Sequence, residues 1–173
     1  YFPLFWVFYL LCAFFFFSGE GRYTIPLTGG GWSLWLDKEA SWQNDRLYLP
    51  HEITDLSLLP VNVPTGGWQT LSHNPDAVPV EVPGTVEEYL TVTDNPRPEN
   101  FRGVSWWYRK ITIPADQQKK RFIIYFESVR MRAEVYLDGK LVAYDLIGET
   151  PFHVDITDEA KPGKVVPKVK SFS

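Results

Sequence analysis

The sequence reads Gly103-Val104-Ser105-Trp106-Trp107-Tyr108-Arg109-Lys110-Ile111-Thr112-Ile113-Pro114 and then, after a polar turn, Arg121-Phe122-Ile123-Ile124-Tyr125-Phe126. A third run, Ala133-Glu134-Val135-Tyr136-Leu137, leads through Asp138-Gly139 into Lys140-Leu141-Val142-Ala143-Tyr144. These runs are short, rich in aromatic and β-branched residues, and separated by turn residues, which is typical of β-strands. Asp-Gly between two such runs predicts a hairpin with a type I′ turn, because both central residues of that turn need a positive φ. The stretch therefore predicts consecutive antiparallel strands in an all-β sandwich.

The rest of the chain carries the same kind of strand pattern. Both faces of residues 122–126 are apolar, so we expect that strand to be covered on both sides. Residues 32–37 and 78–82 are also expected to be strands, and Pro79 requires an edge or a strand start, where no ladder donor is needed. Residues 85–90 are expected to form one helical turn with the threonine at its start as N-cap. We expect little other helix between residues 32 and 157.

Several ordered motifs resemble the N-terminal sugar-binding domain of family 2 glycoside hydrolases, which include β-galactosidases, β-glucuronidases and β-mannosidases. The motifs are Val82-Pro83-Gly84-Thr85-Val86-Glu87-Glu88-Tyr89, Trp106-Trp107-Tyr108-Arg109, Phe126-Glu127-Ser128-Val129, Val135-Tyr136-Leu137-Asp138-Gly139-Lys140 and Pro151-Phe152-His153-Val154-Asp155-Ile156-Thr157. The resemblance runs from about residue 32 to residue 163. It implies a jelly roll of the galactose-binding-domain-like type.

The resemblance also implies that other domains complete the parent enzyme. The family continues into an immunoglobulin-like domain and a TIM barrel that holds the two catalytic glutamates, and neither domain is in this sequence. Pro167 falls where the family's next strand donates a ladder hydrogen bond. We therefore expect a fragment of a longer gene product, truncated or frame-shifted near Lys164.

Composition and charge limit the classes of function. The 173 residues suffice for one domain with its own core. The net charge of −4 comes from charges of mixed sign without a basic stripe, so we expect no nucleic-acid partner. The single cysteine excludes an internal disulfide, and the three histidines are far apart in the sequence, so we expect no metal and no other cofactor.

The N-terminal seventeen residues are apolar and uncharged, and Ser18-Gly19-Glu20-Gly21 follows them. This pattern predicts a secretory signal peptide over residues 1–21, and hence a secreted or periplasmic protein. Two alternatives are a membrane anchor at the short limit for spanning a bilayer and a lipid-modified Cys12. A core strand is not expected, because such strands have about 4–8 residues. The sugar-binding domain is then expected over residues 22–173.

The carboxylates do not form a supported catalytic pair. Retaining glycosidases use two carboxyl groups about 5–5.5 Å apart. Glu87 and Glu88 are adjacent and diverge on a helical turn, whereas Glu127 and Glu134 lie on neighbouring strands and are expected to face solvent. We expect the isolated chain to be inactive as a glycosidase.

The candidate binding residues are tryptophans and one polar loop. Trp106 and Trp107 point to opposite faces of their strand, so one indole is expected to be exposed and to meet sugar or another domain. The loop 93–100 contributes Asp94, Asn95 and Asn100, and by resemblance to β-galactosidases Asn95 matches a sugar-contacting asparagine. Trp42 and Trp68 are further candidates. The alternative is core packing, with both indoles covered by residues 52–74.

Three functions remain in competition. The first is the non-catalytic sugar-binding domain, here a fragment, of a secreted family 2 glycoside hydrolase that hydrolyses O-glycosyl bonds in carbohydrate metabolism. The second is a stand-alone carbohydrate-binding module. The third is a structural domain that docks a catalytic partner. Exposed aromatic residues serve binding and docking alike, so motif order alone favours the first.

Overall fold

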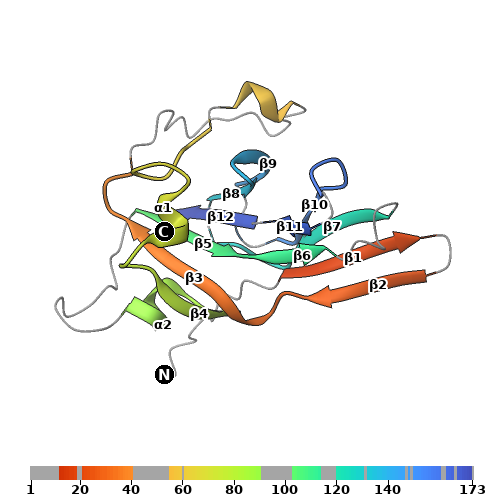
Figure 1. The fold of residues 1–173 in the computed structure, drawn as a ribbon, viewed down its shortest axis with the longest axis horizontal. Helices are drawn as coiled ribbons and strands as arrows, with labels where there is room; N and C mark the ends of the chain where they lie inside the picture. The colour runs from red at the N-terminus through yellow and green to blue at the C-terminus, as the bar shows by residue number, and fades with distance from the viewer. Residues whose placement is uncertain are drawn as a thin grey trace, which may run out of the picture.

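The computed structural model describes residues 12–18, 21–40, 55–59, 61–90, 103–113, 120–130, 132–146, 148, 150–160, 163–165 and 167–172. The strands are β1 (Cys12–Ser18), β2 (Gly21–Pro26), β3 (Gly29–Asp37), β4 (Val78–Val82), β5 (Val104–Arg109), β6 (Ile111–Ile113), β7 (Arg121–Phe126), β8 (Arg132–Leu137), β9 (Lys140–Asp145), β10 (Phe152–Asp155), β11 (Gly163–Val165) and β12 (Pro167–Phe172). The described helices are the short elements η1 (Leu56–Leu58), α1 (Thr70–His73) and α2 (Val86–Leu90) (Figure 1). The expectation of an all-β fold with little helix is confirmed.

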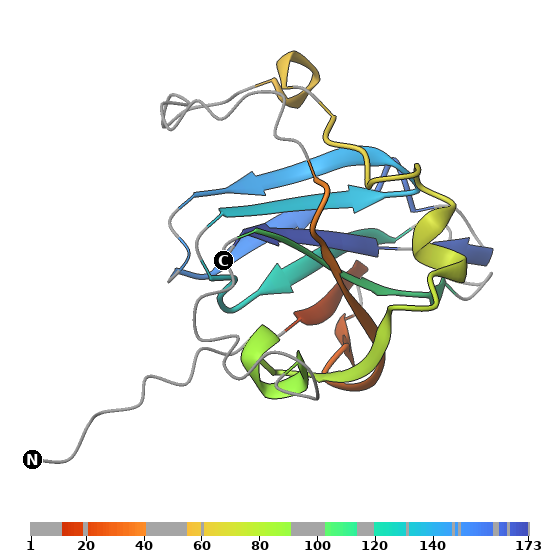
Figure 2. The same ribbon diagram turned by 90° about the vertical axis from the view of Figure 1, so that its left-hand side faces the viewer.

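Two antiparallel sheets form the sandwich (Figure 2). The larger sheet has the order β4-β3-β5-β12-β8-β9, and the smaller one has the order β10-β7-β1-β2. Strands β11 and β6 form a separate pair. The main core contains Trp107 and Val135 from the larger sheet together with Phe122 and Ile124 from the smaller one. Strand β7 is buried at Phe122, Ile123 and Ile124, so the expected cover on both of its faces is confirmed.

The larger sheet is covered on its outer face as well. A second apolar cluster joins Trp106, Tyr136 and Leu141 of the sheet to Leu71 of α1, and Trp68 packs against it. These residues reach the outer face because neighbouring residues of a strand point to opposite sides. The segment 61–71 therefore forms a third layer over this sheet, and we call it the covering segment.

The predicted hairpin turn is present between β8 and β9. Leu137 pairs with Lys140, and the two residues between them have positive φ, 46° at Asp138 and 90° at Gly139. A Cβ atom at position 139 would lie 3.1 Å from Nε1 of Trp68. Glycine is thus required both by the turn and by the close approach of Trp68 from the covering segment.

The residues that lead from β4 into α2 form a capping box at the start of the helix and pack closely around Gly84. Thr85 Oγ1 accepts a hydrogen bond from the Glu88 N–H at 3.2 Å, and Glu88 Oε2 accepts one from the Thr85 N–H at 3.4 Å, which is a capping box. A Cβ atom at Gly84 would lie 2.6 Å from the Tyr89 ring. The N-cap prediction is confirmed, as is the edge position of Pro79, because β4 is the outermost strand of its sheet.

The N-terminal run contributes an inner strand, which corrects one expectation. Strand β1 (Cys12–Ser18) pairs with β2 on one side and with β7 on the other (Figure 1). The exclusion of a core strand on grounds of length was wrong, because the strand uses only six residues of the longer apolar run, followed by Ser18. The described fold thus includes Cys12, earlier than the expected domain start at residue 22. Among the described residues, no helix is long and apolar enough to cross a membrane.

The segment after Lys164 also differs from the expectation. Residues 167–172 form β12, which lies between β5 and β8 in the larger sheet. Pro167 does not break this strand, because it is the first residue and starts the ladder opposite Leu137.

Candidate functional site

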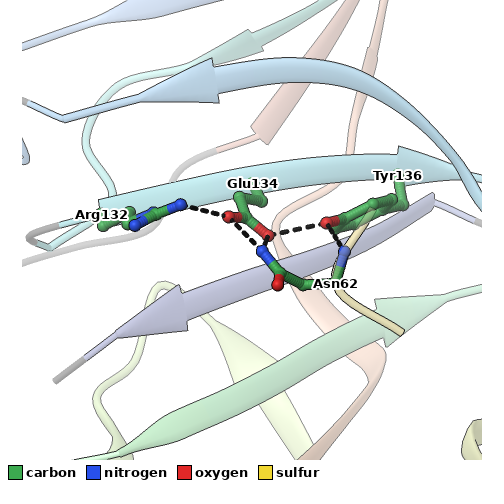
Figure 3. A network of polar contacts seen from close by, with 4 residues as sticks. All are labelled: Asn62, Arg132, Glu134 and Tyr136. Atoms are coloured by element: carbon green, nitrogen blue, oxygen red, sulfur yellow. Dashed lines mark hydrogen bonds and ion pairs between the residues drawn. The ribbon is translucent and has the colours of Figure 1, made fainter. Parts of the chain in front are cut away.

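A buried polar network is the most distinctive group of charged and polar side chains on the outer face of the larger sheet. Arg132, Glu134 and Tyr136 are alternate residues of β8, so they share one face of the strand. Asn62 approaches them from the covering segment (Figure 3). Glu134 is 2% exposed and Asn62 4% exposed. A carboxylate this deeply buried needs partners for both of its oxygens.

Glu134 receives hydrogen bonds at both carboxylate oxygens. Asn62 Nδ2 donates to Oε1 at 2.9 Å and to Oε2 at 3.0 Å. Tyr136 donates its hydroxyl proton to Oε2 at 2.7 Å, and Arg132 forms an ion pair with Oε1 at 2.8 Å. The backbone N–H of Asn62 donates in turn to the Tyr136 hydroxyl at 3.2 Å. Asn62 is therefore held by both its backbone and its side chain.

The electrostatics keep the two nearby phenols protonated. Burial raises the pKa of Tyr136, and the negative charge of Glu134 and the hydrogen bond to it raise that pKa further. Burial also raises the pKa of Tyr144 to about 12, although the Arg132 guanidinium 5.0 Å from its ring centre opposes the shift. At neutral pH the Tyr136 hydroxyl is therefore available as a donor to Glu134.

The expectation that Glu134 faces solvent was wrong, whereas Glu127 is exposed as expected. The difference arises because Asn62 and the segment around it lie over β8. With its oxygens engaged by Asn62, Tyr136 and Arg132, Glu134 is not placed to transfer a proton to a substrate. The arrangement instead fastens the covering segment to the sheet.

Asp37 provides a second buried anchor for the same segment. Its Oδ2 accepts hydrogen bonds from the Thr65 N–H at 2.9 Å and from Nε1 of Trp106 at 3.2 Å, and the residue is 2% exposed. The segment 61–71 is thus tied to β8 through Asn62 and to the end of β3 through Thr65.

The expected exposed indole is absent from β5. Trp106 is 0% exposed and Trp107 5% exposed. Trp106 packs edge-on against Trp68 with ring centres 5.6 Å apart, and Trp107 donates to Ser105 Oγ at 3.2 Å. The two indoles do point to opposite faces, but each face is covered. Neither offers an open ring face for stacking on sugar, so the expectation of one exposed indole was wrong.

The remaining predicted site residues, Asp94, Asn95 and Asn100, lie outside the described residues, as does Trp42. Within the described ranges, no cluster of three or more His, Cys, Asp or Glu side chains has the arrangement of a metal site. Sequence reasoning missed Asn62, Arg132 and Tyr136. One signal was available, since Arg132 and Glu134 are charged residues at alternate positions of an otherwise apolar strand.

Comparisons with known proteins place this fold among glycosidases. No family model matches the chain. The β-glucuronidase of Formosa agariphila is 36% identical over 64 residues, which are 37% of this chain and 6% of that protein. The β-galactosidase of Thermoanaerobacter pseudethanolicus is 37% identical over 65 residues, which are 38% of this chain and 9% of that protein. The solved structure of Faecalibacterium prausnitzii β-glucuronidase superposes with a TM-score of 0.61 and 26% identity over 90% of this chain.

The chain resembles the N-terminal sugar-binding domain of family 2 glycoside hydrolases. The structural likeness spans nearly all of this chain but only 22% of the Faecalibacterium prausnitzii enzyme. The structure locates two of the motifs on which this resemblance depends. The Trp106-Trp107-Tyr108-Arg109 motif forms β5, and the Asp138-Gly139 motif forms the β8–β9 turn. Both motifs lie in the larger sheet, beneath the covering segment.

Proposed function

We propose that this chain is the non-catalytic sugar-binding domain of a longer family 2 glycoside hydrolase, which hydrolyses O-glycosyl bonds. The observation that carries the proposal is the shared fold over 90% of the chain with an enzyme of which the chain spans 22%. The named relatives include a β-glucuronidase and a β-galactosidase, so the proposed substrate class is β-glycosides. The proposed partners are carbohydrate and the immunoglobulin-like and TIM-barrel domains of the parent enzyme.

A non-catalytic role is supported by how the glutamates are used. Glu134 is buried and hydrogen-bonded, and Glu88 caps α2. Glu87 lies 3.9 Å from Arg130 at the surface. These contacts engage each of the three carboxylates with different residues. This favours a domain that supports catalysis elsewhere in the parent protein.

An activity assay tests the proposal. The purified chain is incubated with nitrophenyl β-glucuronide, β-galactoside and β-mannoside, beside an intact family 2 enzyme as positive control. We expect no turnover above the rate without enzyme. Turnover that disappears in a Glu134→Gln variant of this chain would refute the non-catalytic role.

A docking domain is the second candidate, and the burial of both β5 tryptophans favours it over a stand-alone sugar-binding module. Galactose, glucuronate and mannose are titrated against the intrinsic tryptophan fluorescence. A saturable change with one sugar supports carbohydrate contact. A flat response to all three at millimolar concentration supports docking.

We also propose that the parent protein is secreted or periplasmic, with residues 1–21 as its signal peptide or, alternatively, as a membrane anchor. The composition of the N-terminal run supports this proposal, whereas the inner-strand position of Cys12–Ser18 argues against removal of these residues. N-terminal sequencing of protein recovered from the periplasm or the medium gives the processing site. A mature protein that retains residue 12 would rule out cleavage near residue 21.

A further inference from the structure

In the smaller sheet, β1 occupies an inner position between β2 and β7. It pairs with both neighbours over most of its length, from Cys12 opposite Phe126 to Phe17 opposite Arg121, and from Ala13 opposite Pro26 to Ser18 opposite Gly21. An inner strand provides ladder partners on both of its sides. Removing β1 would therefore leave a gap in which β7 has an unpaired edge and β2, the outermost strand of this sheet, has lost its strand partner.

The β7 side of this gap calls for an apolar occupant at consecutive positions. Phe122, Ile123 and Ile124 of β7 are 1%, 9% and 1% exposed, so β7 is buried on both faces. Their register partners in β1 are Phe16, Phe15 and Phe14. A segment with a polar side chain at every second position would place those groups beside a buried strand, which is costly. The run of phenylalanines meets this requirement.

The occupant is also the part of the chain whose composition is typical of a removable leader. One segment thus combines a leader-like sequence with an inner position in a sheet. Along the chain it is followed by β2, one of its two pairing partners.

We propose that the position between β2 and β7 is a strand-acceptor site, which binds an extended apolar peptide segment antiparallel to β7, and that Cys12–Ser18 is its exchangeable occupant. Main-chain hydrogen bonds to β2 and β7 supply the affinity, as in other cases of strand addition to a sheet. The apolar environment of β7 supplies the selectivity. This proposal does not depend on the sugar-binding role.

The test uses the full chain with a protease recognition sequence inserted between Gly19 and Glu20, so that β1 can be cut from β2 after folding. A fluorescent peptide with the sequence of residues 11–19, extended by lysines for solubility, is added to the cut and uncut proteins. We expect the cut protein to bind the peptide at least tenfold more tightly than the uncut one, measured by fluorescence anisotropy. Unlabelled peptide should compete.

Two control peptides test the chemistry of the site. Phe15→Pro removes the backbone donor in the middle of the strand, and Phe14→Lys places a charge opposite the buried Ile124. Each substitution should weaken binding at least tenfold. Equal binding of the Phe15→Pro peptide, or equal binding by the cut and uncut proteins, would overturn the proposal.

Hydrogen exchange distinguishes strand insertion from binding elsewhere. In the cut protein, amides of β7 should lose protection as Cys12–Ser18 departs, and the added peptide should restore it over residues 121–126. If cutting unfolds the protein and the peptide refolds it, the proposal is also supported. A cut protein that stays unfolded with the peptide, or whose β7 amides remain unchanged by it, contradicts the proposal.

Discussion

At the scale of single residues, the two buried carboxylates have a structural role, because each binds the covering segment through hydrogen bonds. Glu134 and Asp37 both accept hydrogen bonds from the segment 61–71, through Asn62 and Thr65. A buried charge is tolerated only when donors surround it, and here the donors come from a segment distant in sequence. The carboxylates therefore fix the position of the covering layer.

The first prediction concerns Glu134→Gln. The new amide would place an N–H₂ group where Asn62, Tyr136 and Arg132 already donate, so at least one donor loses its acceptor. We expect a loss of about 2 kcal/mol in the free energy of unfolding, somewhat below the ~3–5 kcal/mol for breaking a fully buried pair. Urea denaturation measures it. The control Glu127→Gln, at an exposed glutamate, should change stability by less than about 0.5 kcal/mol.

The second prediction concerns Asp155 and pH. Burial raises the pKa of Asp155, but hydrogen bonds from Thr157 and Arg121 outweigh it and hold that pKa below the usual value for aspartate. Because the folded-state pKa is lowered, the stabilisation is present above pH ~4 and is lost as the pH falls through the lowered value. Asp155→Asn should therefore lower the urea midpoint at pH 7, and the difference from the parent should vanish near pH ~2.

The size of the Asp155 effect is limited by solvent. The side chains of Arg121 and Asp155 are 59% and 42% exposed, so water screens their ion pair. Asp76→Asn, at an exposed aspartate, serves as the control for the loss of one negative charge. A constant difference between Asp155→Asn and the parent from pH 7 to pH 2 would contradict the prediction.

At the scale of elements, the β8–β9 hairpin and the segment that carries Trp68 depend on each other. Gly139 has a φ of 90°, and its missing side chain makes room for Trp68. Trp68 in turn packs on Trp106 and on Tyr136, with ring centres 5.6 Å and 4.9 Å away. The turn type thus sets how closely the covering layer approaches the sheet.

The third prediction separates these two roles of Gly139. Gly67 has a φ of 91°, nearly the same as Gly139, but a Cβ atom there would meet nothing within 4 Å. Gly67→Ala should therefore report backbone strain alone, about 1 kcal/mol. Gly139→Ala should cost more, because its Cβ would also lie 3.1 Å from the Trp68 indole. Thermal or urea unfolding of both variants measures the difference. Equal losses would show that Trp68 has no part in it.

At the scale of the whole molecule, the features that depend on local pattern could be predicted from the sequence. The alternating runs predicted β3, β4, β5, β8 and β9 of the larger sheet, Asp138-Gly139 predicted the hairpin, and Thr85 predicted the N-cap. Each of these depends on residues within a few positions of one another. The order of the strands does not follow from them, because most neighbouring strands in the two sheets are not consecutive in sequence.

The features that depend on distant contacts could not be predicted in this way. Asn62 and Glu134 are 72 residues apart in sequence, and no periodicity links them. Burial of both Trp106 and Trp107 required knowing that residues 61–71 cover the outer face. The role of Cys12–Ser18 was missed because a leader and a buried strand are both continuous apolar runs. Composition cannot separate the two, whereas pairing with β2 and β7 can.

The place of β12 in the larger sheet has a consequence for biosynthesis. This strand is the last described element of the chain, yet it lies in the interior of the sheet and is the link between β5 and β8. As the polypeptide leaves the ribosome, β3 and β5 can pair early, and so can β8 and β9. The β3–β5 pair and the β8–β9 pair are not connected to each other in the sheet until residues 167–172 emerge. Until then the nascent protein carries unpaired edges on β5 and β8, and such edges are where partly made chains aggregate.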